Sequence, residues 1–553
     1  MDKKNLFWIF LIILLLGLHF FGLSRGDTLN DEVLYGFRAI GLLDFFNNPV
    51  QTTPLEWFDP NIPWWTHLSF HDHPPLVFII QYVFLSLFGD NLTALRLPSA
   101  ILGLFSAYLL YRLGSLLYDK KTGIIAGIIF GITLNHIYIF REGMMEPFVI
   151  FFIILASLLF LRAVKRSEKL HIAFIALGLG FLAKYTAIFL LPVFISYLFL
   201  FHGEYFKRKE TLLSFFLLVL VVSPVILYNI ELYQATGHFD FQISHALGQN
   251  PEVWSIAPGK EIGSLWDRVS QFIPRMITSQ SWVFLSLFVF SILGLITQCF
   301  SDVKGSLKKH IFPLLLFFFL MLMIAKVGPA FRFLTLLTPF IALSVAVLIG
   351  SLYDALGKRG YRIFAYSLFG ILIAWESLYS INNQIVYYPK GPEPWLASKI
   401  RYENYNQGYN QLDNYLTQEL DRKVPKLTFN TNYSFLSKIQ SEAIQEERTF
   451  GYQEYPALIV YLGNFDPAPK LWIFDRRLVY HGWPTMDFDS YKDIILKNGA
   501  DYYKELGFKT AYFILQDNII PDAIFQATVK NTDPSFIENP KGEPIFTVYK
   551  KSL

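Results

Sequence analysis

Long apolar stretches recur from the N-terminus to about residue 380, and they limit this chain to one class of fold. Of its 553 residues, 53% are hydrophobic and only 16% are charged. A helix needs about 20 predominantly apolar residues to cross a bilayer. The sequence therefore predicts a polytopic α-helical membrane protein with about 11 to 13 spans. Eleven stretches are counted as spans, at 6–23, 97–117, 123–140, 147–163, 170–183, 185–201, 211–229, 281–298, 310–325, 331–350 and 361–380.

Lysine and arginine gather in loops between alternate apolar stretches, and this pattern predicts the orientation. Short loops rich in these residues stay in the cytoplasm. The basic loops are Lys3-Lys4, Lys120-Lys121, Arg162–Lys169, Lys207–Lys209 and Lys304–Lys309, with a weaker one at Lys358-Arg359. We therefore expect the loop 230–280 and everything after the last span to be extracytoplasmic. The thirteen-residue segment 76–88 is left out of the count and is expected to be interfacial, because counting it would invert every later loop.

The character of the chain changes after residue 384, where Tyr, Asn, Gln and Lys replace the runs of Phe and Leu. Alternating segments predict strands at 426–429, 457–462 and 510–515, and helical patterns predict helices at 409–420 and 490–506. We expect a transmembrane domain over 1–383, with outer loops 24–96 and 230–280, and a soluble extracytoplasmic α/β domain over 384–553. No nucleotide-binding fingerprint is present, and the net charge of +3 indicates no nucleic-acid partner.

An acidic pair, Asp31-Glu32, follows the first span by eight residues and lies outside on this topology. The segment Val33–Phe46 alternates apolar and polar positions, which favours a helix along the membrane interface. Ionisable residues at a membrane face are functional candidates. The structural alternative is that Asp31 caps this helix and Glu32 favours its positive end.

Further polar candidates lie on the same predicted face. Lys184, Arg141 and Arg332 stand at outer ends of spans, where the alternative is that they reach the headgroup region. Glu146 precedes Pro147, a pair that also suits the start of a helix. The turn His71-Asp72-His73 is stiffened by two prolines. Its imidazole and carboxylate groups suit a divalent metal such as Zn, Mg or Mn.

Five sequence stretches carry a resemblance to a known family. They are D-E-V-L-Y from Asp31, H-D-H-P-P-L from His71, L-F-G-D-N-L-T-A-L-R-L-P-S-A-I-L-G around Arg96, R-E-G-M-M-E-P from Arg141, and L-G-L-G-F-L-A-K-Y-T around Lys184. Their order and spacing resemble the polyprenyl-phosphate-dependent glycosyltransferases of the GT-C fold, near bacterial protein O-mannosyltransferase-like proteins and the lipid A aminoarabinose transferases. The resemblance implies a lipid-linked sugar donor and an extracytoplasmic active site in the inner membrane.

The resemblance also implies roles for the candidate residues. Asp31 matches the catalytic base of an inverting displacement, with Glu32 and Glu146 positioning the acceptor, sugar or metal. Lys184 matches the family's phosphate-binding lysine, and Arg141 and Arg332 are further phosphate candidates. His73 stands where the lipid A transferases carry another phosphate-binding lysine, so the chain departs from the pattern there. The stretch F-D-F-Q-I-S-H resembles the one that brings a histidine, here His245, to a metal site in those relatives.

The acceptor is left open between lipid A or lipopolysaccharide, another envelope glycan and the hydroxyl of a secreted protein. A secondary transporter with an external domain is the alternative from another class. Transporters usually show internal repeats and ionisable groups at mid-membrane. Here the charged residues gather at span ends, with Glu376 as the main exception. A receptor or scaffold would leave the outer acidic and histidine motifs without a purpose.

Overall fold

The computed structural model describes residues 3–46, 52–249, 251–254, 263–301, 306–386, 388–403 and 405–553. Contacts within the chain divide it into two units. The helical unit comprises Met1–Leu23 and Trp64–Tyr402, and the mixed unit comprises Ser24–Pro63 and Glu403–Leu553. This division differs from the predicted domains in two respects: the first part of the outer loop 24–96 groups with the C-terminal residues, and residues 384–402 group with the helical unit. The hydrogen bonds and ring contacts that join the described residues of Ser24–Pro63 to the C-terminal residues are given below.

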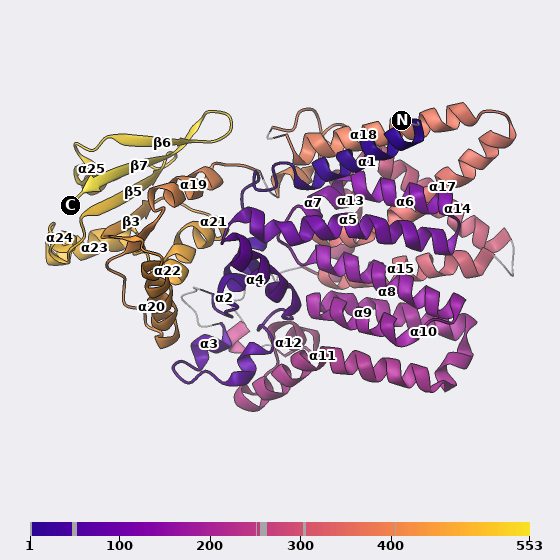
Figure 1. The fold of residues 1–553 in the computed structure, drawn as a ribbon, viewed down its shortest axis with the longest axis horizontal. Helices are drawn as coiled ribbons and strands as arrows, with labels where there is room; N and C mark the ends of the chain where they lie inside the picture. Colours follow the sequence, from indigo (N-terminus) through magenta and orange to yellow (C-terminus); the bar gives the residue numbers. More distant parts are fainter. Residues whose placement is uncertain are drawn as a thin grey trace. The chain divides into compact units, whose positions relative to one another are not determined.

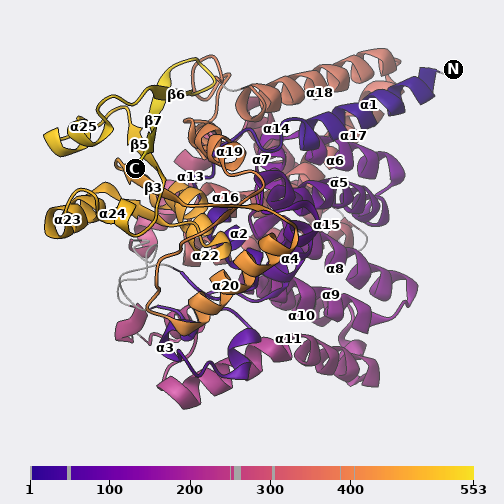
Figure 2. The same ribbon diagram turned by 60° about the vertical axis from the view of Figure 1, so that its left-hand side comes forward.

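The helical unit is a bundle whose long helices run side by side (Figures 1 and 2). Along the chain, α5 packs against α6 and α8, α8 packs against α9, and α9 packs against α11. The helices are α1 (Lys3–Phe20), α4 (Leu76–Phe88), α5 (Leu92–Leu117), α6 (Lys120–Ile132), α7 (Leu134–Phe140), α8 (Glu146–Arg166), α9 (Leu170–Ala183), α10 (Leu190–Phe201), α11 (Lys209–Thr236), α12 (Phe241–Ala246), α13 (Leu265–Ser279), α14 (Trp282–Ser301), α15 (Ser306–Val327), α16 (Phe331–Leu334), α17 (Thr338–Lys358) and α18 (Arg362–Gln384). Short turns of 3₁₀ helix include η2 (Tyr185–Phe189) and η5 (Thr335–Leu337).

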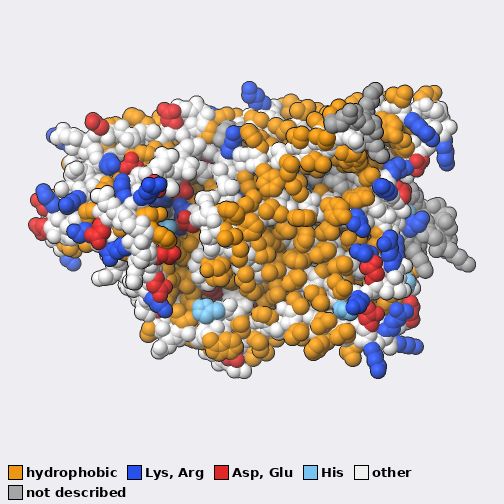
Figure 3. All heavy atoms as spheres, viewed as in Figure 1, with side chains coloured by type: hydrophobic (Ala, Val, Ile, Leu, Met, Phe, Trp, Pro, Cys, Tyr) orange, Lys and Arg blue, Asp and Glu red, His pale blue; other side chains and the backbone are white. Residues whose placement is uncertain are grey.

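Many apolar side chains of this bundle face outward. Phe199 is 76% exposed and Leu212 is 74% exposed. Figure 3 shows a broad face of hydrophobic side chains over the helical unit, with charged side chains gathered at its right-hand end. Such a surface is suited to lipid rather than to water.

Within the described residues, six helices are long and apolar enough to cross a membrane, or seven if the bent pair α6 and α7 is one span. The prediction of a polytopic helical membrane protein is confirmed at this level. The remaining predicted spans coincide with shorter apolar helices, at Asn5–Phe20, Leu170–Ala183, Tyr185–Phe201 and Trp282–Thr297. The count of eleven stays a prediction. The segment expected to be interfacial, 76–88, forms a helix with those same bounds, α4.

The mixed unit is built on a five-stranded sheet with the strand order β4-β3-β5-β7-β6. β3 pairs in parallel with β4 and β5, whereas β7 pairs antiparallel with β5 and β6. The strands are β1 (Lys423–Pro425), β2 (Gln453–Tyr455), β3 (Ala457–Leu462), β4 (Thr485–Asp487), β5 (Thr510–Gln516), β6 (Pro534–Glu538) and β7 (Pro544–Ser552). The helices are α2 (Glu32–Gly41), α3 (Pro54–Trp57), α19 (Tyr409–Glu419), α20 (Ser434–Thr449), α21 (Pro467–Lys470), the π-helix η7 (Leu471–Asp475), α22 (Arg476–His481), α23 (Phe488–Asn498), α24 (Tyr502–Glu505) and α25 (Ala523–Val529).

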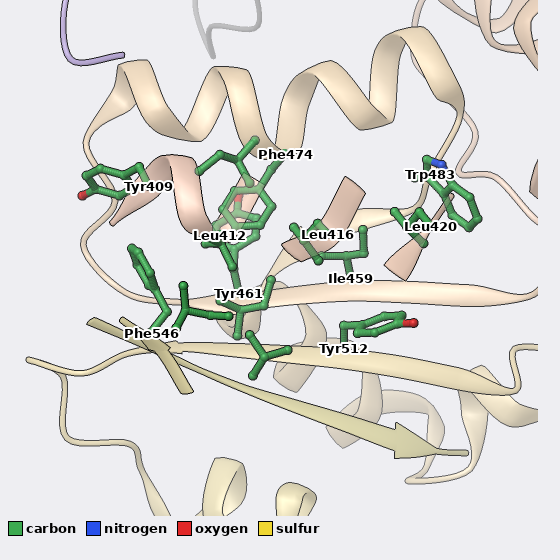
Figure 4. Close-up of a cluster of buried hydrophobic side chains, with 14 of the residues drawn as sticks. Tyr409, Leu412, Leu416, Leu420, Ile459, Tyr461, Phe474, Trp483, Tyr512 and Phe546 are labelled. Carbon is green, nitrogen blue, oxygen red and sulfur yellow. The ribbon is translucent and has the colours of Figure 1, made fainter. Parts of the chain in front are cut away.

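Both faces of this sheet are buried, and alternate residues of one strand enter opposite cores. Ile459 and Tyr461 of β3 join Leu412 and Leu416 of α19 in one cluster (Figure 4). Leu458 of β3 lies in the other cluster, with residues of α23 and α25. This alternation follows from the two-residue period of a strand. The predicted α/β architecture of this region is therefore observed.

Three predicted elements have different bounds in the structure. The strand expected at 426–429 is wrong, because β1 ends at Pro425, which cannot donate to a ladder. The helix expected at 490–506 is interrupted at Gly499, whose φ of +102° favours glycine. The interfacial helix expected over Val33–Phe46 is the shorter α2, which ends where Leu42 adopts a left-handed conformation.

Candidate functional site

The best-defined polar group in the helical unit is a buried ion pair between α8 and the end of α9. Lys184 Nζ lies 2.6 Å from Glu146 Oε1, and both side chains are almost completely buried. Glu146 is the first residue of α8 and Pro147 follows it, so the helix begins where its carboxylate favours the positive helix end. Lys184 is the C-terminal capping residue of α9, where the chain turns into η2. The pairing thus joins the ends of two adjacent helices.

A second cation reaches the same place from α16. Arg332 acts electrostatically on the Glu146 carboxylate together with Lys184. Both cations lie near the ring of Phe333, with Lys184 Nζ 5.1 Å and Arg332 Cζ 5.0 Å from its centroid. Two cationic side chains thus lie near one carboxylate. Lys184 and Glu146 are buried, whereas Arg332 is partly exposed. Cationic side chains placed in this way are suited to a phosphate or phosphodiester.

The carboxylate of Glu146 has spare hydrogen-bonding capacity. Its Oε1 accepts from Lys184, but its Oε2 is buried without a hydrogen-bond partner among the described residues. An unsatisfied buried acceptor costs about 1–3 kcal/mol, and such groups are often found at functional sites. A hydroxyl group, such as that of a sugar, would satisfy this oxygen.

Next to Lys184, Tyr185 belongs to a second polar cluster centred on Asp240. The Asp240 carboxylate accepts hydrogen bonds from the Tyr185 hydroxyl (2.6 Å), the Asn229 side chain (3.0 Å) and the backbone N–H of Ile243 (2.8 Å). Asp240 caps the N-terminus of α12 and is completely buried. Burial raises the pKa of its carboxyl, and the negative charge of Asp72 acts in the same direction. The cluster therefore connects α11, α12 and the turn around Asp72.

We expect Asp240→Ala to lower the stability of the folded protein by about 1–3 kcal/mol, because the Tyr185 hydroxyl and the start of α12 each lose their acceptor. Thermal unfolding followed by size-exclusion chromatography measures this.

Asp240→Asn tests how the free energy of unfolding depends on pH, because it replaces the ionisable carboxyl by a neutral amide of similar size. The raised pKa means that the folded protein holds this proton more tightly than the unfolded chain. The contribution of Asp240 to the free energy of unfolding is therefore complete below the ordinary pKa of 3.8, and it is lost as the pH rises through the raised pKa of the folded state. Asp240→Asn should remove that decline, and an identical pH profile would contradict the assignment.

The histidine turn lies close to α12 through its backbone. The N–H of Phe241 donates to the carbonyl of His71 (2.7 Å). The His71 ring stacks on Trp254, and His73 Nδ1 lies 3.1 Å from Asp72 Oδ1. Within the described parts of the chain, no group of three or more His, Cys, Asp or Glu side chains is arranged to hold a metal ion. The predicted set of His71, Asp72 and His245 is therefore not assembled, and no step below depends on a metal.

Two arginines of the sequence motifs, Arg141 and Arg96, donate hydrogen bonds to backbone carbonyls. The Arg141 guanidinium donates four hydrogen bonds, to the carbonyls of Leu18, His19, Phe21 and Gly22 at the end of α1. Arg96 donates to the carbonyl of Leu23 (3.0 Å) and lies 3.9 Å from Glu142. Lysine or arginine near a helix C-terminus satisfies carbonyls that lack partners within the helix. The observed contacts of Arg141 are those of a helix cap, whereas Arg332 accompanies Lys184.

The acidic pair lies in the mixed unit, at the start of α2. Asp31 occupies the N-cap position, but its side chain makes no capping hydrogen bond. Instead, the side chain of Asn30 accepts from the N–H of Glu32 (3.0 Å), and Asp31 accepts from the Tyr35 hydroxyl (3.4 Å). The expectation that Asp31 caps the helix is wrong, because its neighbour does so. Glu32 is completely buried in the first turn.

Comparison with known proteins gives the class of fold. Residues 72–228 match the family model described as dolichyl-phosphate-mannose-protein mannosyltransferase, a stretch that includes Glu146 and Lys184. The structure of ArnT from Cupriavidus metallidurans bound to undecaprenyl phosphate aligns with 99% of this chain and 98% of its own, with a TM-score of 0.55 and 12% identity. The chain therefore has the fold of the GT-C glycosyltransferases, as the sequence motifs predicted.

Two curated relatives come from Bacillus subtilis (strain 168). "Putative mannosyltransferase YycA" is 30% identical over 152 residues, which are 27% of this chain and 22% of that protein. "Putative mannosyltransferase YkcB" is 26% identical over 237 residues, which are 41% of this chain and 32% of that protein. The chain thus matches about a quarter to a third of the length of these relatives.

Sequence reasoning missed the residues that surround the predicted ones. Asp240 lies inside the stretch F-D-F-Q-I-S-H, in which the predicted functional residue is His245. An aspartate directly before a helical turn is an N-cap signal, and this signal is present in the sequence. No local sequence pattern indicates the contact of Phe333 with both cations, because this contact depends on how α16 packs near the end of α9.

Proposed function

We propose that this protein is an integral membrane glycosyltransferase that moves a sugar from a polyprenyl-phosphate donor to a hydroxyl of an envelope acceptor. The observation that carries the proposal is the buried ion pair of Lys184 and Glu146, with Arg332 nearby, within a GT-C fold. The two cations suit the donor phosphate, and the unsatisfied oxygen of Glu146 suits a sugar hydroxyl. The structural neighbour bound to undecaprenyl phosphate favours this lipid class.

In the proposed reaction, Asp31 acts as general base. Its carboxylate takes the proton of the acceptor hydroxyl as the acceptor oxygen forms a bond to the anomeric carbon. The bond between that carbon and the phosphate oxygen breaks, and polyprenyl phosphate leaves with the electron pair. Lys184 and Arg332 stabilise the charge that grows on the phosphate. Direct displacement inverts the anomeric configuration, and Glu32 supports the position of the acceptor.

The names of the two relatives favour mannose as the first sugar to test. The purified protein in lipid nanodiscs should release undecaprenyl phosphate from undecaprenyl-phosphate mannose when an envelope extract is added, and mass spectrometry should find the acceptor gaining one hexose. Comparison of lipids, glycans and proteins from cells with and without the gene separates a lipid A or glycan acceptor from a protein hydroxyl. The acceptor we propose first is lipid A or another envelope glycan.

The outcome that would overturn this function is solute uptake into vesicles without any sugar transfer, which would indicate a transporter. Glu376 is the residue to examine in that case. It is buried in α18, and it accepts a hydrogen bond from the Ser281 hydroxyl at the start of α14.

The hypothesis of a metal site has a separate test. Chelation followed by addition of Zn²⁺, Mg²⁺ or Mn²⁺ should remove and restore transfer if His71, Asp72 and His245 gather around an ion during the reaction.

A further inference from the structure

The segment Ser24–Pro63, which carries the acidic pair, is attached to the C-terminal residues at three separate places. All three attachments lie within the mixed unit. The first is at Asp27, whose carboxylate is completely buried at the start of α19. It accepts hydrogen bonds from the backbone N–H groups of Tyr409 (3.3 Å) and Asn410 (2.9 Å). The Asn410 side chain donates in return to the carbonyls of Ser24 (3.0 Å) and Gly26 (2.7 Å).

The second attachment is on α2 itself. The Tyr480 hydroxyl of α22 donates to the carbonyl of Phe37 (2.6 Å), and the two rings lie 5.2 Å apart. Gly41 at the end of α2 leaves just enough room for this tyrosine, because a Cβ there would come within 2.7 Å of the Tyr480 ring. Helix α2 also packs against α21 and the π-helix η7. Helix α2, which follows Asp31, thus packs against the C-terminal residues.

The third attachment is at Asp59, beyond α2. Its carboxylate accepts from the hydroxyl of Ser434 (2.7 Å) and from the backbone N–H groups of Ser434 (3.0 Å) and Phe435 (3.2 Å), at the start of α20. Asp27 and Asp59 therefore perform the same task on two helices, each satisfying N–H groups that have no partner inside the helix. An acidic side chain near each end and a tyrosine contact on α2 thus hold the described parts of the segment to the C-terminal residues.

Helix α2 has ten residues, which is too short to be stable alone in water. Among its buried residues, Phe37 contacts Tyr480, and the helix packs against α21, η7 and α22 of the mixed unit. The order of α2 therefore depends on the sheet domain against which it folds.

We propose that the C-terminal domain, residues 403–553, is a positioning device for the acidic pair, with Tyr480 as its main positioning residue. This inference rests on the proposed role of Asp31 as the base. Transfer geometry is sensitive to displacements of about 1 Å, which can cost about one hundredfold in rate. On this account the domain is required for turnover even though it holds no base, nucleophile or phosphate-binding residue of the proposed reaction.

The test uses the full-length protein and three variants at the contact. Tyr480→Ala removes ring and hydroxyl, Tyr480→Phe removes only the hydroxyl, and Gly41→Ala pushes a methyl group into the ring. Gly17→Ala is the matched control, because nothing lies within 4 Å of a Cβ at that glycine. We expect Tyr480→Ala and Gly41→Ala to lower kcat by about tenfold to one hundredfold. The Kd for undecaprenyl phosphate should stay within about twofold of the wild-type value, because the phosphate-binding cations lie in the other unit.

Hydrogen exchange of the α2 amides gives a readout independent of activity. In Tyr480→Ala these amides should exchange faster, while those of α8 should not change. Tyr480→Phe should be intermediate in both measurements, and Gly17→Ala should match the wild type. Faster exchange in α2 with unchanged kcat would overturn the positioning role, as would unchanged exchange with reduced kcat. Full activity of Asp31→Asn would instead show that the proposed base, and not the packing, is wrong.

Discussion

Replacement of Asp31 by asparagine should reduce sugar transfer by about one hundredfold to ten thousandfold, the range typical for loss of a general base. The amide cannot take the proton of the acceptor hydroxyl, so the oxygen that attacks the sugar remains protonated. The measurement is kcat for release of undecaprenyl phosphate from the donor, together with the Kd for undecaprenyl phosphate. We expect kcat to fall and the Kd to stay unchanged, because the phosphate-binding group of the proposed reaction is Lys184 with Arg332.

The structure explains why this variant should still fold. Asp31 makes no capping hydrogen bond, since Asn30 accepts from the N–H of Glu32. Asparagine is also about as good as aspartate at the N-cap position. A loss of activity therefore cannot be attributed to a lost helix cap.

Glu32→Gln is the matched control, because it makes the same change from carboxylate to amide at the next residue. Its proposed role is support of the acceptor, so we expect a higher KM for the acceptor and a smaller change in kcat than in Asp31→Asn. Near-normal kcat in Asp31→Asn, or an equal loss in both variants, would reject the assignment of Asp31 as the base.

The helical part of the fold was accessible from the sequence because its signal is local. A run of apolar residues such as 97–117 or 147–163 requires a buried or lipid-covered helix whatever surrounds it. The bounds of α4 were also predicted correctly, since Pro75 and Gly89 mark its two ends. In contrast, the pattern over Val33–Phe46 gave no signal for its end, because the left-handed turn at Leu42 is not a usual place for leucine.

The arrangement of the candidate site was less accessible, because its contacts join residues far apart in the chain. Lys184 has no acidic neighbour in the sequence, yet it pairs with Glu146 in the structure. That pairing requires α8 and α9 to lie antiparallel, with the start of α8 next to the end of α9, and no local sequence pattern predicts this arrangement. The attachment of Ser24–Pro63 to the C-terminal domain is similar. Its decisive contacts join Asp27 to α19 and Phe37 to Tyr480, hundreds of residues apart.

The variant Lys184→Ala should have two large effects that must be separated. Removing one partner of a buried ion pair costs about 3–5 kcal/mol, because the other charge stays buried without compensation. Here the remaining charge is Glu146, which keeps the electrostatic attraction of Arg332 but loses its ion-pair hydrogen bond, and whose second oxygen already lacks a hydrogen-bond partner among the described residues. We therefore expect Lys184→Ala to give a low yield of folded protein, and reduced donor binding in this variant alone would not identify a phosphate contact.

The double variant Lys184→Met/Glu146→Gln removes both charges while keeping similar side-chain volumes, so most of the stability should return. Loss of the charge-assisted hydrogen bonds to phosphate, at about 1.5–3 kcal/mol, should still weaken binding of undecaprenyl phosphate by about tenfold to one hundredfold. Glu146→Gln alone is the control, because it keeps the lysine and removes the carboxylate that competes with phosphate. That variant should bind undecaprenyl phosphate at least as tightly as the wild type. If the folded double variant binds this lipid with wild-type affinity, Lys184 has no contact with the phosphate, and the donor site must lie elsewhere in the fold.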